Sequence, residues 1–231
     1  MIQLILSLLL PLVFAYVTLR YSAWQTGRHL DERSKPLRDP VLEPVMAQMA
    51  AALEVPKIAV HVYDVEPVNG LAAPDGRIFL TRGFIDRYRQ GIVSAEEIAS
   101  VVAHEMGHVA LGHTKRRMID VTGQNAAFML IATLLSRFIP IVGVFVASYV
   151  TRALGAGLSR KDENEADAYA SALLVKAGIG VEPQKSLFRK LDRLTGAAAG
   201  GAEVPQWLRS HPKTAERIAA IEAREAKWGL R

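Results

Sequence analysis

The sequence of 231 residues contains no cysteine. Disulfide bonds, thiolate metal sites and cysteine nucleophiles are therefore excluded, and any metal ion must be held by histidine and carboxylate side chains. Aromatic residues make up only 7% of the chain, and its lysines and arginines form no dense run although the net charge is +5. Because a nucleic-acid-binding protein gathers its positive charge, we do not expect nucleic acid as a partner.

Charged residues are also absent from Ile2 to Leu19, where leucine, isoleucine and valine dominate. About 20 apolar helical residues cross a hydrocarbon core of about 30 Å, so residues 1–20 are predicted to form a transmembrane anchor that contacts membrane lipid. A cleaved secretory signal is the alternative, but no basic segment precedes the stretch and no small-residue cleavage site follows it. Tyr16, Tyr21 and Trp24 would lie at the membrane interface.

Residues 21–40, which follow this anchor, are predicted to form a juxtamembrane linker or helix. Their basic residues, together with Arg20, outnumber their acidic ones. The positive-inside rule then predicts a single-pass protein of the cell (inner) membrane, with a domain over residues 41–231 in the cytoplasm.

Hydrophobic periodicity in this domain predicts an α+β fold that is mostly helical and has a small antiparallel sheet. Helices are expected over Pro40–Glu54, Ser94–Gly112, Ser159–Ala177, Glu182–Leu194 and Lys213–Trp228. Strands are expected over Lys57–Tyr63 and Arg77–Thr81, and the extended segment Asn69–Ala73 should form a hairpin with the second strand. The glycine- and alanine-rich residues Gly196–Gly201 are expected to form a flexible loop.

The pattern HExxH at residues 104–108 lies inside the apolar helix that begins with a capping box at Ser94. Residues four apart share one helix face, so His104 and His108 present two imidazoles to one point, as two zinc ligands do. Glu105 is placed to act as a general base toward a metal-activated water. HExxH also arises by chance, so the motif alone does not establish a metal site. A third ligand elsewhere in the chain would support one.

Two candidates exist for that third ligand, since catalytic zinc takes three protein ligands. His113 invites comparison with the pattern HExxHxxGxxH, but this chain has Leu111 and Thr114 where that pattern requires glycine and histidine. Glu163 on the predicted helix over residues 159–177 is the other candidate. Asp167, one turn further on, is placed to accept the second ring N–H of a ligand histidine.

Gln124–Leu154 is a second hydrophobic stretch, which Arg137 and Pro140 interrupt. A single membrane crossing would place Glu163 and the two histidines on opposite sides. Two full crossings need about 40 residues, whereas 154 minus 123 gives 31. We therefore predict a helical hairpin that either packs on the domain or dips shallowly into the bilayer.

Three further motifs accompany HEMGH in a fixed order: NGLAAPDGRIFLTRG at residues 69–83, SRxxExxAD at residues 159–167, and SHP at residues 210–212 followed by Arg217-Ile218. With these motifs, residues 41–225 resemble the HtpX and CAAX-prenyl-endoprotease family of HExxH zinc metallopeptidases. The resemblance implies a zincin-like metallopeptidase domain that binds one Zn²⁺ per chain through His104, His108 and Glu163.

The resemblance also implies a role for each motif in peptide-bond hydrolysis. Glu105 would be the catalytic base, and polypeptides would be the substrates. His211 would either stabilise the oxyanion or occupy the open zinc position in a resting state, and Arg217 would order that corner. The residues that would pair with the substrate backbone are Asn69, Gly70, Leu71, Ala72 and Ala73.

Two departures from the family limit this comparison. Gly70 stands where the family usually has alanine, and the segment between HExxH and Glu163 is shorter than the two-span insertion of HtpX-like members. We expect a metalloendopeptidase in membrane or envelope protein quality control. A membrane-anchored, non-proteolytic binding or chaperone-like module on the same fold is the alternative, and the sequence predicts no oligomeric state.

Overall fold

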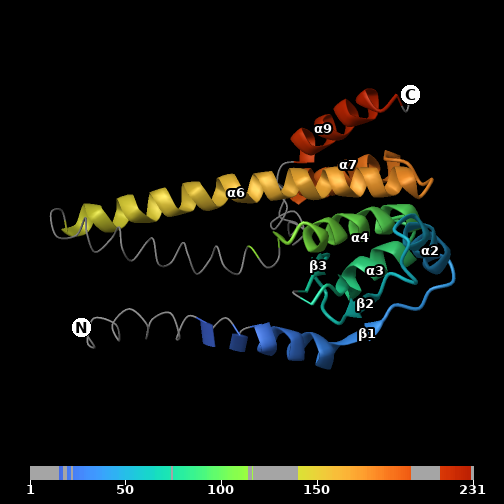
Figure 1. Cartoon of the computed structure of the whole chain (residues 1–231), viewed down its shortest axis with the longest axis horizontal. Helices are drawn as coiled ribbons and strands as arrows, with labels where there is room; N and C mark the ends of the chain where they lie inside the picture. The colour runs from blue at the N-terminus through green and yellow to red at the C-terminus, as the bar shows by residue number, and fades with distance from the viewer. Residues whose placement is uncertain are drawn as a thin grey trace. The chain divides into compact units, whose positions relative to one another are not determined.

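The computed structural model describes residues 16–17, 20–21, 23–73, 75–113, 116, 140–198 and 214–229. The chain divides into two compact units: Met1–Glu32 with His113–Arg160, and Arg33–Gly112 with Lys161–Arg231. The second unit contains the sheet and the HExxH helix (Figure 1). In the first unit, residues 23–32 are helical.

The predicted transmembrane anchor lies mostly outside the described residues. None of the helices in the described part of the chain is long and apolar enough to cross a membrane. The first arm of the predicted hairpin, residues 124–139, also lies outside the described residues.

Four strands form one mixed sheet in the order β1-β2-β4-β3. The strands are β1 (Ser34–Pro36), β2 (Val60–Tyr63), β3 (Gly70–Ala72) and β4 (Ile78–Thr81). The predicted hairpin is present, since β3 pairs antiparallel with β4. The prediction of an antiparallel sheet is wrong at its centre, because β4 inserts between β3 and β2 and runs parallel to β2. Side-chain alternation identifies a strand but not its neighbour, which explains the error.

The described chain has six labelled helices: α2 (Leu42–Ala52), α3 (Arg82–Arg89), α4 (Ala95–Ala110), α6 (Pro140–Lys176), α7 (Glu182–Ala198) and α9 (Thr214–Lys227). Neither α3 nor β1 was predicted from the sequence. The helix of Glu163 was predicted to begin at Ser159, whereas α6 runs unbroken for 37 residues from Pro140. Proline is favoured in the first turn of a helix, which fits this start. Similarly, α7 continues to Ala198 into the predicted loop, and alanine is a strong helix former.

The HExxH helix, α4, lies at the centre of the second unit and packs against β3, β4, α2 and α7 (Figure 1). Its predicted capping box is present: the Ser94 hydroxyl accepts from the Glu97 amide, and the Glu97 carboxylate accepts from the Ser94 amide. The buried Glu97 carboxylate also accepts from Lys190 Nζ and Ser186 Oγ, each at 2.7 Å. These contacts hold the start of α4 against α7 and so help to position the HExxH residues further along the same helix.

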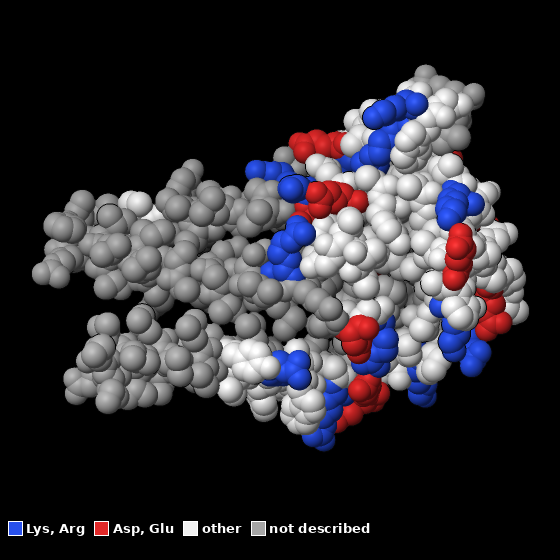
Figure 2. Space-filling model, in the orientation of Figure 1, with Lys and Arg blue, Asp and Glu red and all other residues white. Residues whose placement is uncertain are grey.

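Basic and acidic side chains are interspersed on the face of the molecule in Figure 2. Exposed ion pairs include Arg82 with Asp64 and Arg189 with Glu182, each at 2.7 Å. The absence of a nucleic-acid partner stays a prediction.

Candidate metal centre

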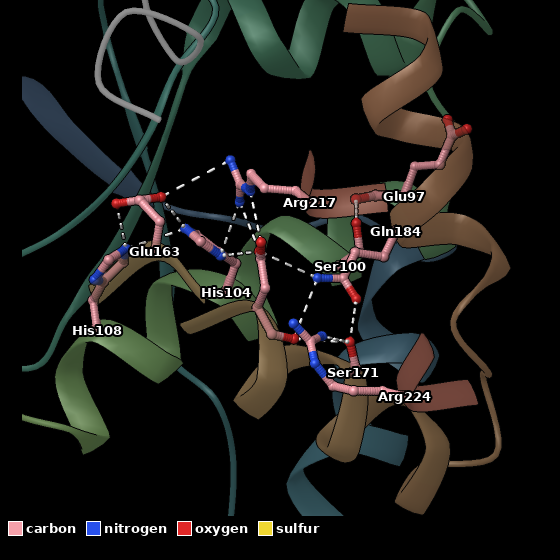
Figure 3. A network of polar contacts seen from close by, with 10 residues as sticks. Glu97, Ser100, His104, His108, Glu163, Ser171, Gln184, Arg217 and Arg224 are labelled. Carbon is pink, nitrogen blue, oxygen red and sulfur yellow. Dashed lines mark hydrogen bonds and ion pairs between the residues drawn. The ribbon is translucent and has the colours of Figure 1, made fainter. Parts of the chain in front are cut away.

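Two helices bring the three predicted ligands to one point. His104 and His108, on α4, are 2% and 4% exposed, and their Nε2 atoms lie 3.1 Å apart. Glu163, on α6, places one carboxylate oxygen 3.4 Å from the Nε2 atom of His104 and the other 3.5 Å from that of His108 (Figure 3). These side chains converge from residues that are far apart in the sequence.

The spacing of these atoms fits a divalent metal ion. Nitrogen and oxygen ligands bound tetrahedrally at about 2.0–2.1 Å lie about 3.4 Å from one another. The separations of 3.1–3.5 Å in the cluster match this value. Two imidazoles and one carboxylate are also a donor set that zinc accepts, leaving one coordination position for water or substrate.

Gly107, inside the HExxH pattern, permits the close approach of α6. A Cβ atom at residue 107 would lie 3.0 Å from the Cα and carbonyl oxygen of Ala166 and 3.2 Å from Cβ of Tyr169. Two of these contacts are to backbone, so a larger residue would push α6, and with it Glu163, away from the histidines. This role of Gly107 was not predicted from the sequence. A glycine inside a helix costs up to about 1 kcal/mol relative to alanine, so its presence in this helix is the signal that could have indicated a close approach.

Asp167 holds the other nitrogen of the His104 ring, as predicted. Its Oδ1 atom lies 2.9 Å from His104 Nδ1 and accepts from Arg217 Nη2 at 2.7 Å. Arg217 Nε donates to Oδ2 at 2.6 Å, so the guanidinium forms a bidentate pair with the carboxylate through two hydrogen bonds (Figure 3). Because Nδ1 faces Asp167, Nε2 is the ring nitrogen of His104 that faces Glu163 and His108, and it is the atom that would bind a metal ion.

The charges in this network determine the state of His104. Burial lowers the pKa of the ring, but its hydrogen bonds with the Asp167 and Glu163 carboxylates raise the pKa to about 9. Burial raises the pKa of Asp167, yet the charge and hydrogen bonds of Arg217 hold that pKa well below its ordinary value. Asp167 is therefore an anion, and cation binding through His104 Nε2 must displace a proton.

Arg217 itself is held by α7. It is 2% exposed, and its Cζ atom lies 4.2 Å from the centroid of the Phe188 ring. Arg217, the predicted supporting residue, thus contacts both His104 and the Phe188 ring of α7. Phe188 was not identified from the sequence, because an aromatic residue on an amphipathic helix has no local signal for this contact.

Glu105 is 3% exposed and lies beside the sheet edge that β3 forms. Asn69 O accepts from the Thr81 amide, and the Ala73 amide donates to Arg77 O, so these residues use their backbone groups on the β4 side. Hydrogen-bonding direction alternates along an antiparallel pair. The backbone groups of Gly70 and Ala72 therefore point to the edge that no other described strand covers.

His211, the remaining predicted site residue, lies outside the described residues. Its assigned role stays a prediction.

Comparison with known proteins places this site in a family. The family model described as "Peptidase family M48" matches residues 36–225. Metalloprotease LoiP of Escherichia coli (strain K12) is 30% identical over 178 residues, which cover 74% of this chain and 64% of LoiP. Metalloprotease YcaL of the same strain is 30% identical over 174 residues, covering 71% of this chain and 61% of YcaL.

A third relative, protease HtpX of Psychrobacter sp. (strain PRwf-1), is 21% identical over 248 residues, covering 91% of this chain and 80% of HtpX. The chain therefore spans less than two thirds of the length of LoiP and YcaL, and most of the length of HtpX.

Proposed function

The chain belongs to peptidase family M48, and from this premise we propose that it is a zinc-dependent endopeptidase acting on polypeptides. The convergence of the side chains of His104, His108 and Glu163 beside Glu105 is the observation that carries the proposal. These residues would hold one Zn²⁺ per chain. When bound, zinc lowers the pKa of a water molecule to about 7 and polarises a substrate carbonyl.

Glu105 is the general base of the proposed reaction. Its carboxylate takes a proton from the attacking water and then delivers it to the leaving amide nitrogen, so no covalent enzyme intermediate is needed. Its burial at 3% exposure keeps bulk water away from the proton that is transferred. His211 is assigned either to oxyanion stabilisation or to the open zinc position in a resting state.

The edge of β3 is the proposed substrate site, over Asn69–Ala73. An extended peptide can add to an exposed sheet edge through backbone hydrogen bonds, which explains binding without a fixed side-chain sequence. The outward N–H and C=O groups of Gly70 and Ala72 supply those bonds. A peptide paired there runs near Glu105, because a Cβ atom at residue 70 would lie 3.6 Å from Oε1 of this side chain.

Metal analysis tests the proposal directly. We expect one zinc per purified chain, and casein cleavage that a chelator stops and added zinc restores. Glu163→Ala should lose zinc and activity while keeping its helical circular dichroism, whereas Asn164→Ala, at an exposed neighbour on α6, should keep both. Full zinc occupancy in Glu163→Ala would contradict the ligand assignment.

We place the proposed endopeptidase at the cell (inner) membrane, as a single-pass protein with its catalytic domain in the cytoplasm and a role in membrane or envelope protein quality control. The uncharged run from Ile2 to Leu19 supports the anchor, and the resemblance to HtpX supports the role. Tyr16, Tyr21 and Trp24 are each more than half exposed, which suits residues that contact lipid headgroups.

Replacing Leu8 and Leu9 together by arginine tests the anchor. Each arginine costs about 2.5–3.5 kcal/mol near the centre of a membrane helix, so the variant should move from the carbonate-washed membrane pellet to the supernatant. The matched variant with isoleucine at both positions should stay in the pellet. A double-arginine variant that also stays there would contradict the anchor.

A further inference from the structure

Gly70, on the proposed substrate strand, lies so close to α4 that an added Cβ atom would meet a side chain of this helix. A Cβ atom added at residue 70 would lie 2.8 Å from Cγ1 of Val101 and 3.6 Å from both Cγ and Oε1 of Glu105. Unbonded carbon atoms pack best at about 3.5–4.0 Å, so a methyl group here requires one neighbour to move. Strand β3 packs against α4 (Figure 1), and it approaches this helix at the turn that carries Val101 and Glu105.

Val101 has little freedom to move aside. It is 1% exposed and lies one helical turn before Glu105 on α4. A β-branched side chain in a helix has one strongly preferred rotamer, and the neighbouring core residues Ile98 and Val102 are fully buried. A side chain at residue 70 is therefore expected to displace β3 rather than Val101.

The position of β3 also determines where its outward backbone groups lie. Gly70 pairs with Leu80 of β4, and hydrogen bonds of Asn69 with Thr81 and of Ala73 with Arg77 flank this pair. Residue 70 thus has Glu105 near its Cβ position on the helix side and presents its own N–H and C=O to the open edge.

We propose that Gly70 is a positioning residue whose close approach to Val101 sets the distance between a peptide bound on β3 and the carboxylate of Glu105. This inference rests on the proposed endopeptidase function. Alanine at this position shifts the strand outward and carries the scissile peptide away from the base. A misplacement of about 1 Å can cost about 100-fold in rate, so a small shift has a measurable effect.

The test compares kcat and KM of four zinc-loaded proteins on a fluorogenic peptide. Gly70→Ala should lower kcat about 10- to 100-fold, with a smaller change in KM and with one zinc retained per chain. Adding Val101→Ala removes the Cγ1 atom in conflict and should restore most of the lost kcat. Adding Val102→Ala instead is the matched control, because this valine is as buried but is not among the three nearest contacts of residue 70.

Each outcome decides the inference. Wild-type kcat in Gly70→Ala overturns it, as does loss of zinc in that variant. Failure of Val101→Ala to restore kcat, or equal recovery with Val102→Ala, also overturns it, since the substitution would then act through general stability. A zinc-loaded wild-type protein that cuts no peptide overturns the proposed function itself, and this result is distinct because it appears before any variant is compared.

Discussion

Glu105→Gln is expected to abolish peptide hydrolysis while leaving one zinc bound per chain. Glutamine has the shape of glutamate but cannot accept a proton at neutral pH, and general-base catalysis contributes about 10²- to 10⁴-fold to a rate. Glu105 lies outside the cluster of His104, His108 and Glu163, so the metal position should be unchanged. Peptide cleavage measured by chromatography and zinc measured by mass spectrometry check the two halves of this prediction.

Glu96→Gln is the matched control, because Glu96 is an exposed carboxylate in the first turn of the same helix. It should cleave at the wild-type rate. If Glu105→Gln cleaves as fast as this control, Glu105 is not the base. A wild-type protein that binds unfolded polypeptide without cutting it would instead favour the chaperone-like alternative.

Arg217→Met is expected to destabilise the protein by about 3–5 kcal/mol, because removal of one partner leaves the other charge of a buried pair uncompensated. The Asp167 carboxylate is fully buried and receives two hydrogen bonds from this guanidinium, at 2.6 and 2.7 Å. Zinc affinity should also fall about 10- to 100-fold, since Asp167 orients His104, which we propose as a zinc ligand. Denaturant unfolding and a competition assay with a zinc-binding dye measure the two effects.

Arg189→Met provides the control for Arg217→Met, because it removes an arginine that is paired with Glu182 but is 43% exposed. An exposed ion pair contributes at most about 1 kcal/mol, so this variant should unfold close to the wild type and bind zinc normally. Equal stability losses in the two variants would show that the Arg217–Asp167 pair has no special role.

The parts of the site that depend on local geometry were predictable from the sequence. Helical periodicity alone places His104 and His108 on one face, and Ser94 with Glu97 marks where that helix begins. The identification of Glu163 and Asp167 used the same periodicity on a second helix. The structure brings these side chains into contact with the histidines of α4.

The direction of the central strands was not predictable from local pattern. Strand β2 has the same side-chain alternation whether its neighbour runs parallel or antiparallel. In the structure β4 lies beside β2 and runs parallel to it. The helix α6 likewise continued past the expected boundary at Ser159.

The sequence by itself determined which residue types face one another along a helix or hairpin, since these relations repeat every few residues. Only the tertiary structure decided which helix and strand surfaces meet. Three close approaches join residues at least 31 positions apart: Gly70 to Val101, Gly107 to Ala166, and the hydrogen-bonded pair of Asp167 and Arg217. Such contacts depend on how whole helices and strands pack together. The hydrophobic periodicity of a short stretch of sequence reports only its own local structure, so it does not predict them.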